Sequence, residues 1–233
     1  MVDLPPIDFA GIADPFEKFE MSMPFNRTLL AVMMAKIEEA HKECGGLGWV
    51  TVNSLAKVLP TRAWSPLKDP ESKLVKTLTS GEFRDPKESQ AEGQIDVNIL
   101  TLFCLFHCSG KPFDRATVFY GILQDGGLDA HEEISAQDKD FKPIFIKMCK
   151  LVTMDIFNLT RSCGETNFAY DESTIRKILD DDNLEIIREE DWLDTVYGHS
   201  SLLKNDRWLQ KVSTDGSWIF SSVQLRQRIF SQA

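Results

Sequence analysis

Cys104, His107 and Cys108 are the residues of this sequence whose types could form a zinc site. Thiolate and imidazole groups bind zinc, but a structural zinc site needs about four ligands, which usually come as two spaced pairs. No second pair follows at that spacing. The three residues also belong to an apolar run that starts at Val97, and a helix that is apolar on all sides is a buried helix. We therefore interpret them as core residues and predict no zinc site.

Nucleophilic chemistry has little more support in the sequence. Cys149 and Cys163 have no histidine near them in the chain, although a histidine from elsewhere could approach them in the fold. The glycine-rich residues 45–48 lack the Lys-Ser/Thr pair of a phosphate loop, and no HExxH or Gly-x-Ser-x-Gly motif is present. The sequence therefore predicts that this protein is not an enzyme, with a cysteine-dependent enzyme kept as an alternative class.

The charge and composition restrict the partners that the protein can have. The 233-residue chain has a formal net charge of −10, and 42% of its residues are hydrophobic, which is typical of a globular protein with an acidic surface. Phosphate binding requires clustered Lys and Arg, so nucleic acid is not expected, whereas cations and basic protein faces suit this charge. No apolar run approaches the roughly 20 residues that span a bilayer, and no membrane span is predicted.

The N-terminal residues and the cysteines indicate a compartment. Residues 1–24 are acidic and contain several prolines, unlike a signal or transit peptide, and we predict that they form an arm. The five cysteines are an odd number and stand mostly in apolar runs, which favours buried, reduced thiols. We therefore expect a cytoplasmic protein, and an association with the cytoskeleton is left open.

A repeated phrase gives the clearest indication of the fold. Residues 48–55 are Gly-Trp-Val-Thr-Val-Asn-Ser-Leu, and residues 93–100 are Gly-Gln-Ile-Asp-Val-Asn-Ile-Leu. In each phrase a glycine precedes a short extended piece that holds one apolar residue, Val50 or Ile95, and a helix follows. Such internal repetition indicates a repeated supersecondary unit.

Helices are predicted on both sides of each phrase. Asn26 is expected to cap a helix with apolar residues at helical spacing, which ends at the glycines of residues 45–48. The Asp-Pro-Glu-Ser sequence at residues 69–72 is expected to start a helix that continues to Thr79. Further helices are predicted near residues 113–123, 140–157 and 221–231, and residues 218–220 are predicted to be extended.

The order of helix, polar loop with a glycine, apolar extended residue and second helix resembles the EF-hand family. In that family a 12-residue loop binds calcium, and the glycine at position six makes the sharp turn. The apolar residue at position eight pairs with the loop of a neighbouring hand. Gly48 and Gly93 match position six, which places Val50 and Ile95 at position eight.

The resemblance implies an all-α fold of paired helix-loop-helix units in two lobes. Very short β-bridges would join the loops through Val50 and Ile95. We expect an N-terminal arm at residues 1–24, a first pair of hands at residues 25–110 and a second, more divergent helical lobe at residues 111–233.

The resemblance also assigns the positions at which calcium ligands would stand. In the loop at residues 43–54, Glu43 at position one and Ser54 at position twelve are a single carboxylate and a single hydroxyl, which is too little for a hard dication. The second loop has Glu88, Gln90, Glu92 and Asp96 at positions one, three, five and nine. It has Ile99 at position twelve, where the family has a bidentate acid.

A later acidic stretch has the best ligand spacing. Asp180, Asp182 and Asp191 match positions one, three and twelve of a calcium loop. Leu184 and Glu185 stand where a ligand and the turn glycine are required, so a solvated acidic helix junction is the competing interpretation. These residues are the predicted metal ligands. No cofactor is expected, and calcium is the one exception left open.

Taken together, these patterns predict a non-catalytic, calcium-independent binding or scaffold subunit. It would present an apolar groove to a partner segment, which we expect to be an amphipathic or basic helix. The candidate groove residues are Met33, Met34, Phe103, Phe106 and Phe119, for which an ordinary core is the favoured competing interpretation. The alternative function is a calcium-binding sensor that uses the partial acidic loops.

Overall fold

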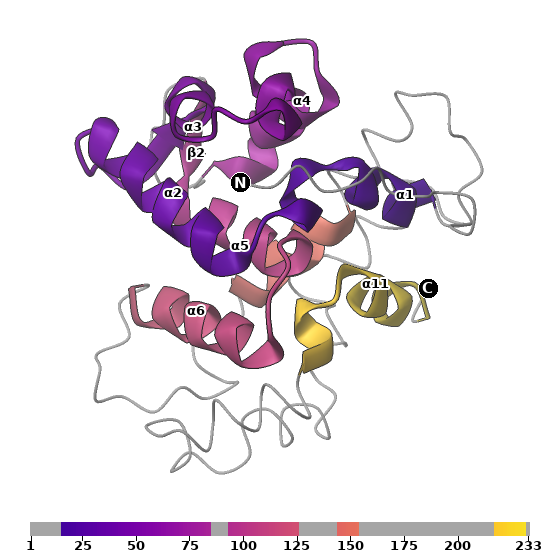
Figure 1. The fold of residues 1–233 in the computed structure, drawn as a ribbon. Helices are drawn as coiled ribbons and strands as arrows, with labels where there is room; N and C mark the ends of the chain where they lie inside the picture. The colour runs from indigo at the N-terminus through magenta and orange to yellow at the C-terminus, as the bar shows by residue number, and fades with distance from the viewer. Residues whose placement is uncertain (1–14, 85–92, 126–143, 154–216, 232–233) are drawn as a thin grey trace. The chain divides into compact units, whose positions relative to one another are not determined.

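The computed structural model describes residues 15–84, 93–125, 144–153 and 217–231 (Figure 1). These residues are mostly helical and include one short two-stranded sheet, in agreement with the all-α prediction. They divide into two compact units, one that ends at Ser109 and one that starts at Gly110. None of the helices in the described ranges is long and apolar enough to cross a membrane.

The first unit contains most of the described elements, in which η denotes a 3-10 helix. In chain order they are α1 (Pro15–Ser22), η1 (Pro24–Arg27), α2 (Leu30–Glu43), β1 (Trp49–Thr51), α3 (Val52–Val58), η2 (Arg62–Lys68), α4 (Lys73–Leu78), η3 (Gly81–Phe83), β2 (Gln94–Asp96) and α5 (Val97–His107). The second unit contains α6 (Pro112–Asp125), a helical segment at residues 144–153, η6 (Ser217–Phe220) and α11 (Ser222–Ser231).

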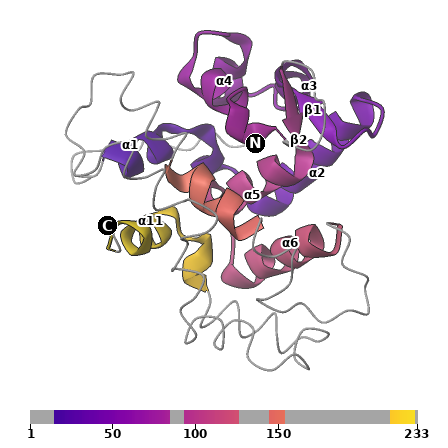
Figure 2. The ribbon, with the colours of Figure 1, turned by 180° about the vertical axis from the view of Figure 1, so that it is seen from behind.

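The strands β1 and β2 lie side by side (Figure 2). Their pairing joins the part of the first unit that contains α2 and α3 to the part that contains α5. They are antiparallel, and the central pair is Val50 with Ile95, the two residues expected to join the loops. Both side chains are completely buried. A two-stranded sheet of this length is not stable in water by itself. The strands are therefore stabilised by the helices that precede and follow them.

The glycines at equivalent places in the repeat have the backbone conformation that the predicted turn requires. Gly48 has a φ of 79° and Gly93 a φ of 85°. L-residues with a side chain disfavour this left-handed region because the Cβ atom approaches the carbonyl oxygen. Gly48 directly precedes β1, and Gly93 directly precedes β2.

The core of the first unit is built around α5. All of its residues from Ile99 to His107 are buried, and it packs against α2 and η1. The Phe103 ring makes edge-on contacts with Phe25 and Phe83, at centroid distances of 5.3 Å and 5.1 Å. The Phe25 ring also meets Trp64, at 4.8 Å. These aromatic residues bring η1, η2, η3 and α5 together.

The prediction that Asn26 caps a helix is wrong. Pro24 starts the 3-10 turn η1, and α2 begins only at Leu30, with Leu29 as its N-cap and no side-chain cap. The Leu30 N–H donates instead to the Ser109 carbonyl oxygen, at 2.7 Å. A backbone acceptor therefore does what the asparagine side chain was expected to do, and the Asn26 amide donates to the Glu20 carbonyl oxygen.

Two further local predictions need correction. The helix expected to start at residues 69–72 is shorter, because Ser72 caps α4 by accepting a hydrogen bond from the Val75 N–H, at 3.2 Å. Residues 218–220 are not extended but belong to the 3-10 helix η6. In the second unit, Phe220 from η6 packs edge-on against Phe119 of α6, at 5.5 Å. The Phe220 side chain is thus buried from a 3-10 helix rather than from an extended segment.

Replacement of Gly93 by alanine tests the turn before β2. The new Cβ would meet no heavy atom within 4 Å, so the expected loss comes from the positive φ alone. We expect Gly93→Ala to lower the free energy of unfolding by about 1–2 kcal/mol, measured by urea denaturation. Gly81→Ala is the matched control, since that Cβ is equally unobstructed and no positive φ is present. Equal effects of the two substitutions would contradict this account of the turn.

Candidate functional site

The loop between α2 and β1 is the best described candidate for a cation site. Helix α2 ends in a Schellman motif: the Gly46 N–H donates to the His41 carbonyl oxygen at 3.0 Å, and the Gly45 N–H donates to that of Lys42 at 3.1 Å. Gly45 has a φ of 82°, which fits the left-handed position that follows the C-cap in this motif. The helix end thus satisfies its own last carbonyl groups before the loop begins.

His41 also closes the loop from the side. Its Nε2 atom accepts a hydrogen bond from the Gly48 N–H at 2.9 Å. The Gly48 carbonyl oxygen accepts a second one from the Val97 N–H, at 3.0 Å. Gly48 therefore connects the end of α2 to the start of α5, and both of its backbone polar groups have protein partners.

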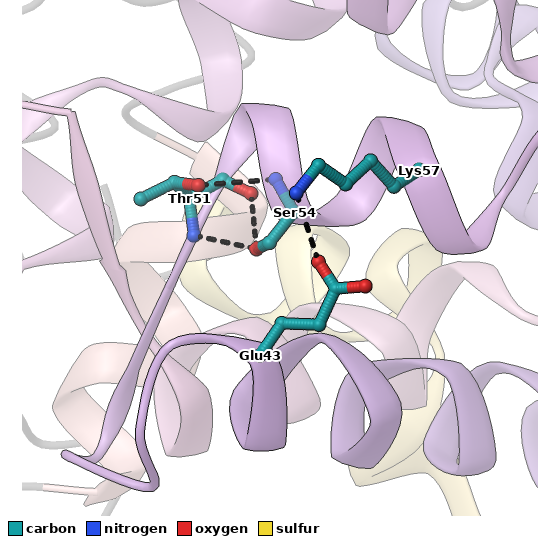
Figure 3. A network of polar contacts seen from close by, with 4 residues as sticks. All are labelled: Glu43, Thr51, Ser54 and Lys57. Atoms are coloured by element: carbon teal, nitrogen blue, oxygen red, sulfur yellow. Dashed lines mark hydrogen bonds and ion pairs between the residues drawn. The ribbon is translucent and has the colours of Figure 1, made fainter.

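Thr51 and Ser54 form a reciprocal capping box at the start of α3 (Figure 3). The Thr51 hydroxyl accepts from the Ser54 N–H, and the Ser54 hydroxyl accepts from the Thr51 N–H, both at 3.0 Å. The Ser54 hydroxyl also donates to the Thr51 carbonyl oxygen at 2.9 Å. Both hydroxyls are therefore engaged with the backbone.

An ion pair links α2 to α3, the helices on either side of this loop. The Lys57 ammonium on α3 lies 3.3 Å from Glu43 Oε2 at the end of α2 (Figure 3). The Lys57 side chain is 71% exposed, so the pair contributes little to stability. The position of the pair matters more than its energy, because the Lys57 ammonium neutralises Glu43, the acid at the first position of the loop.

The other acids near the end of α2 are paired along the helix itself. Glu39 pairs with Lys36 and Glu38 with Lys42. The hydrogen bond and charge of Lys42 lower the pKa of the exposed Glu38 carboxyl. Glu43 is thus the acid of α2 whose partner lies on the next helix.

Asp96 caps α5 as Thr51 caps α3. The Asp96 carboxylate caps α5 by accepting from the Ile99 N–H at 2.8 Å. Asp96 follows Ile95 as Thr51 follows Val50, so the two N-caps stand at matching places in the repeat. Of the other ligand positions predicted for this loop, Glu88, Gln90 and Glu92 lie outside the described residues.

In the described part of these loops, the polar side chains interact with the neighbouring helices. The same part offers no set of ligands for a dication. Three positions that a calcium loop would use, at Glu43, Thr51 and Ser54, are engaged with Lys57 or with the start of α3. Within the described ranges no three His, Cys, Asp or Glu side chains gather into a group that could hold a metal ion. Asp180, Asp182 and Asp191, the predicted metal ligands, lie outside the described residues.

The thiols of α5 and of residues 144–153 have the surroundings of core groups. Cys104, Cys108 and Cys149 are buried and are not disulfide-bonded. Burial, together with a hydrogen bond to Cys108, raises the pKa of Cys104 well above its usual value. Burial also raises the pKa of Cys149. A nucleophilic cysteine needs the opposite shift, because the thiolate is the reactive form.

The candidate groove residues are not exposed in this structure. Met33 and Phe103 are completely buried in the first unit, Phe106 is 8% exposed, and Phe119 is completely buried in the second unit. Met34 is half-buried. Met33, Phe103 and Phe119 are therefore core residues in this structure, as the competing interpretation has it. The sequence could not decide between core and groove, because helical spacing identifies an apolar face without showing what covers it.

Sequence analysis did not identify several residues that organise the loop. Lys57 and His41 act through contacts between residues that are distant along the chain, and a spacing pattern does not contain such contacts. Thr51 and Ser54 carried a usable signal, since a Ser or Thr three residues before a second polar residue is typical of a capping box.

Comparisons with protein-family models, with curated proteins and with solved structures find no match to this chain. The function must therefore be inferred from its own residues.

The capping box can be tested by a double-mutant cycle. Thr51→Ala and Ser54→Ala should each lower the free energy of unfolding by about 1 kcal/mol, because each leaves a backbone N–H at the start of α3 without its acceptor. The double variant should cost less than the sum, since the two hydroxyls act as one unit. Lys57→Gln is the control, with an expected loss below about 0.5 kcal/mol for an exposed ion pair. Strict additivity in urea denaturation would contradict the reciprocal geometry.

Cysteine labelling distinguishes core thiols from a reactive one. With iodoacetamide on the native protein, we expect Cys44, which is partly exposed, to react before Cys104 and Cys149, which stay protected because they are buried with raised pKa values. Peptide mapping by mass spectrometry measures each rate. The same protein in urea is the control and should show all thiols reacting alike. Fast labelling of Cys104 or Cys149 in the folded chain would revive the alternative of a cysteine enzyme.

Proposed function

We propose that this protein is a non-catalytic binding or scaffold subunit, whose first unit is a pair of EF-hand-like helical hairpins held together without calcium. The first hairpin would be α2 and α3, and the second α4 and α5. Each contributes one strand to the sheet that pairs Val50 with Ile95. Positive-φ glycines at equivalent places and matching N-caps support the relationship between the hairpins.

The observation that carries the proposal is the way in which the first loop is closed. Glu43 is bound to Lys57, Thr51 and Ser54 are bound to each other, and Gly48 is bound to His41. A calcium loop brings several carboxylates together and needs the ion to neutralise them. This loop has no such repulsion to overcome, so its closed form needs no ion.

We further propose that the partner is a protein segment, most simply an amphipathic helix. The net charge of −10 favours a partner with basic residues at its polar face. Buried thiols whose pKa values are raised support a role without nucleophilic catalysis. Reduced thiols also suit the proposed cytoplasmic location.

Calorimetry with calcium tests the proposal against its sensor alternative. A sensor binds calcium in the micromolar range and gains thermal stability from it. We expect neither a saturable heat nor a change in Tm between calcium and a chelator. The purified full-length chain is the sample, and a known calcium sensor serves as the positive control.

A saturable heat at micromolar calcium would overturn calcium independence. The triple variant with Asn at residues 180, 182 and 191 would then show whether those acids hold the ion. Affinity capture in calcium and in chelator should retrieve the same partner in equal amount. A partner retrieved only in calcium would contradict a constitutive scaffold.

A further inference from the structure

The 3-10 helix η2 has a buried side and an exposed side. A 3-10 helix has three residues per turn, so side chains three positions apart lie one above the other. Trp64 and Leu67 have this spacing and are both buried, which fixes η2 on the first unit. The side chains of a second row with the same spacing are exposed. This second row, which we call the η2 row, consists of Arg62, Ser65 and Lys68.

The Ser65 hydroxyl at the centre of the η2 row is accessible and not engaged. Ser65 is exposed, and within the described ranges its hydroxyl has no hydrogen-bond partner. Two other serines of the first unit differ in this respect. Ser54 donates from its hydroxyl to the Thr51 carbonyl oxygen at 2.9 Å, and Ser72 donates to that of Pro66 at 2.7 Å. Ser65 therefore offers a hydroxyl that can react without the loss of a structural hydrogen bond.

The two cations of the η2 row differ from the paired lysines of the first unit. Among the described residues, Arg62 and Lys68 form no ion pair. One turn of a 3-10 helix advances about 6 Å, so each cation lies one turn from Ser65, on opposite sides of it. A negative group attached to Ser65 would thus have an unpaired cation on either side. The lysines that are paired with glutamates are Lys36, Lys42, Lys57 and Lys76.

The residues that follow Ser65 fit one class of modifying enzyme. Ser65 is the one Ser or Thr of the chain that directly precedes a proline. Proline has no N–H, so it suits a kinase whose binding groove has no acceptor for the N–H after the reacting serine. Lys68, three residues after Ser65, adds the kind of charge by which kinases select their substrates. Pro66 also cannot donate to the Ala63 carbonyl oxygen, so η2 lacks one of its backbone hydrogen bonds beside Ser65.

We infer that Ser65 is a phosphorylation site of the folded protein, modified by a proline-directed kinase, and that Arg62 and Lys68 hold the phosphate. The Ser65 Oγ atom bonds to the γ-phosphorus of ATP, the bond from that phosphorus to ADP breaks, and the hydroxyl proton passes to the base of the kinase. The phosphate carries about −1.5 to −2 charges at pH 7, so it offsets both cations. The inference goes beyond the proposed function and does not depend on it.

Phosphorylation of the purified full-length chain by a cyclin-dependent kinase with ATP tests the site. Peptide mapping by mass spectrometry should place one phosphoryl group on Ser65 and leave Ser54 and Ser72 unmodified. Ser65→Ala should abolish the modification, and Pro66→Ala should slow it at least about tenfold. A peptide of residues 60–72 is the control for kinase activity. Phosphorylation of the peptide but not of the native chain would overturn the inference.

A less stable variant distinguishes a folded substrate from an unfolded one. If the kinase acts on the folded chain, Gly93→Ala should be phosphorylated at the wild-type rate, since residue 93 lies outside η2. If Ser65 reacts only in the unfolded chain, the loss of stability expected for Gly93→Ala should raise the rate by about 5- to 30-fold, together with the unfolded population. A rate increase of that size would overturn the inference.

Phosphorus NMR of the phosphorylated protein tests the role of Arg62. The second pKa of a phosphoserine is about 6, and a nearby cation lowers it because it favours the more charged form. We expect this pKa to be lower in the wild type than in Arg62→Gln, which retains Pro66 and Lys68 for the kinase. Lys57→Gln is the matched control, since Lys57 lies on α3 and pairs with Glu43. Equal pKa values in the wild type and Arg62→Gln would contradict a phosphate held by the η2 row.

Discussion

The pairing of Val50 with Ile95 is the constraint on which the first unit depends. Side chains alternate between the two faces of a strand, so a slip of one residue would turn both of these buried side chains away from the core. Burial of each aliphatic side chain contributes about 1.5–3 kcal/mol. The N-caps of α3 and α5 come directly after these residues, so the register of the strands also fixes where each helix begins. Three paired residues on each strand thereby orient α2, α3 and α5.

The loop before β1 is closed by contacts between protein groups. Binding a dication gathers negative oxygens, which repel one another when the ion leaves. Here the acid at the first position meets an ammonium group, and the remaining polar groups form neutral hydrogen bonds. Each such bond contributes about 1 kcal/mol, and the groups would be costly to leave unpaired. Together these contacts stabilise the closed form of the loop.

The features that sequence analysis predicted correctly are those set by local chemistry. The left-handed glycines Gly48 and Gly93 and the apolar residues between glycine and helix are determined by neighbouring residues, so the repeat was enough to place them. The burial of α5 followed from an apolar composition on every side. These are properties of a segment that do not depend on its distant contacts.

The features that sequence analysis missed depend on distant residues. Leu30 takes its helix cap from Ser109, which no pattern around Asn26 could indicate. Lys57 reaches Glu43 across the hairpin. Helical spacing identified Met33 and Phe103 as apolar faces, but whether such a face meets a partner or the same chain is decided by the fold.

If the proposed function is right, a hairpin pair that closes without calcium is not regulated by calcium through its first loop. Any change in what its core presents must then come from a competing contact, because a conformational equilibrium shifts only with a ligand that prefers one state. Such a contact would have to compete with the aromatic packing of the core, in which Phe25 lies between Trp64 and Phe103 and the Ser109 hydroxyl donates to the Asn26 carbonyl oxygen.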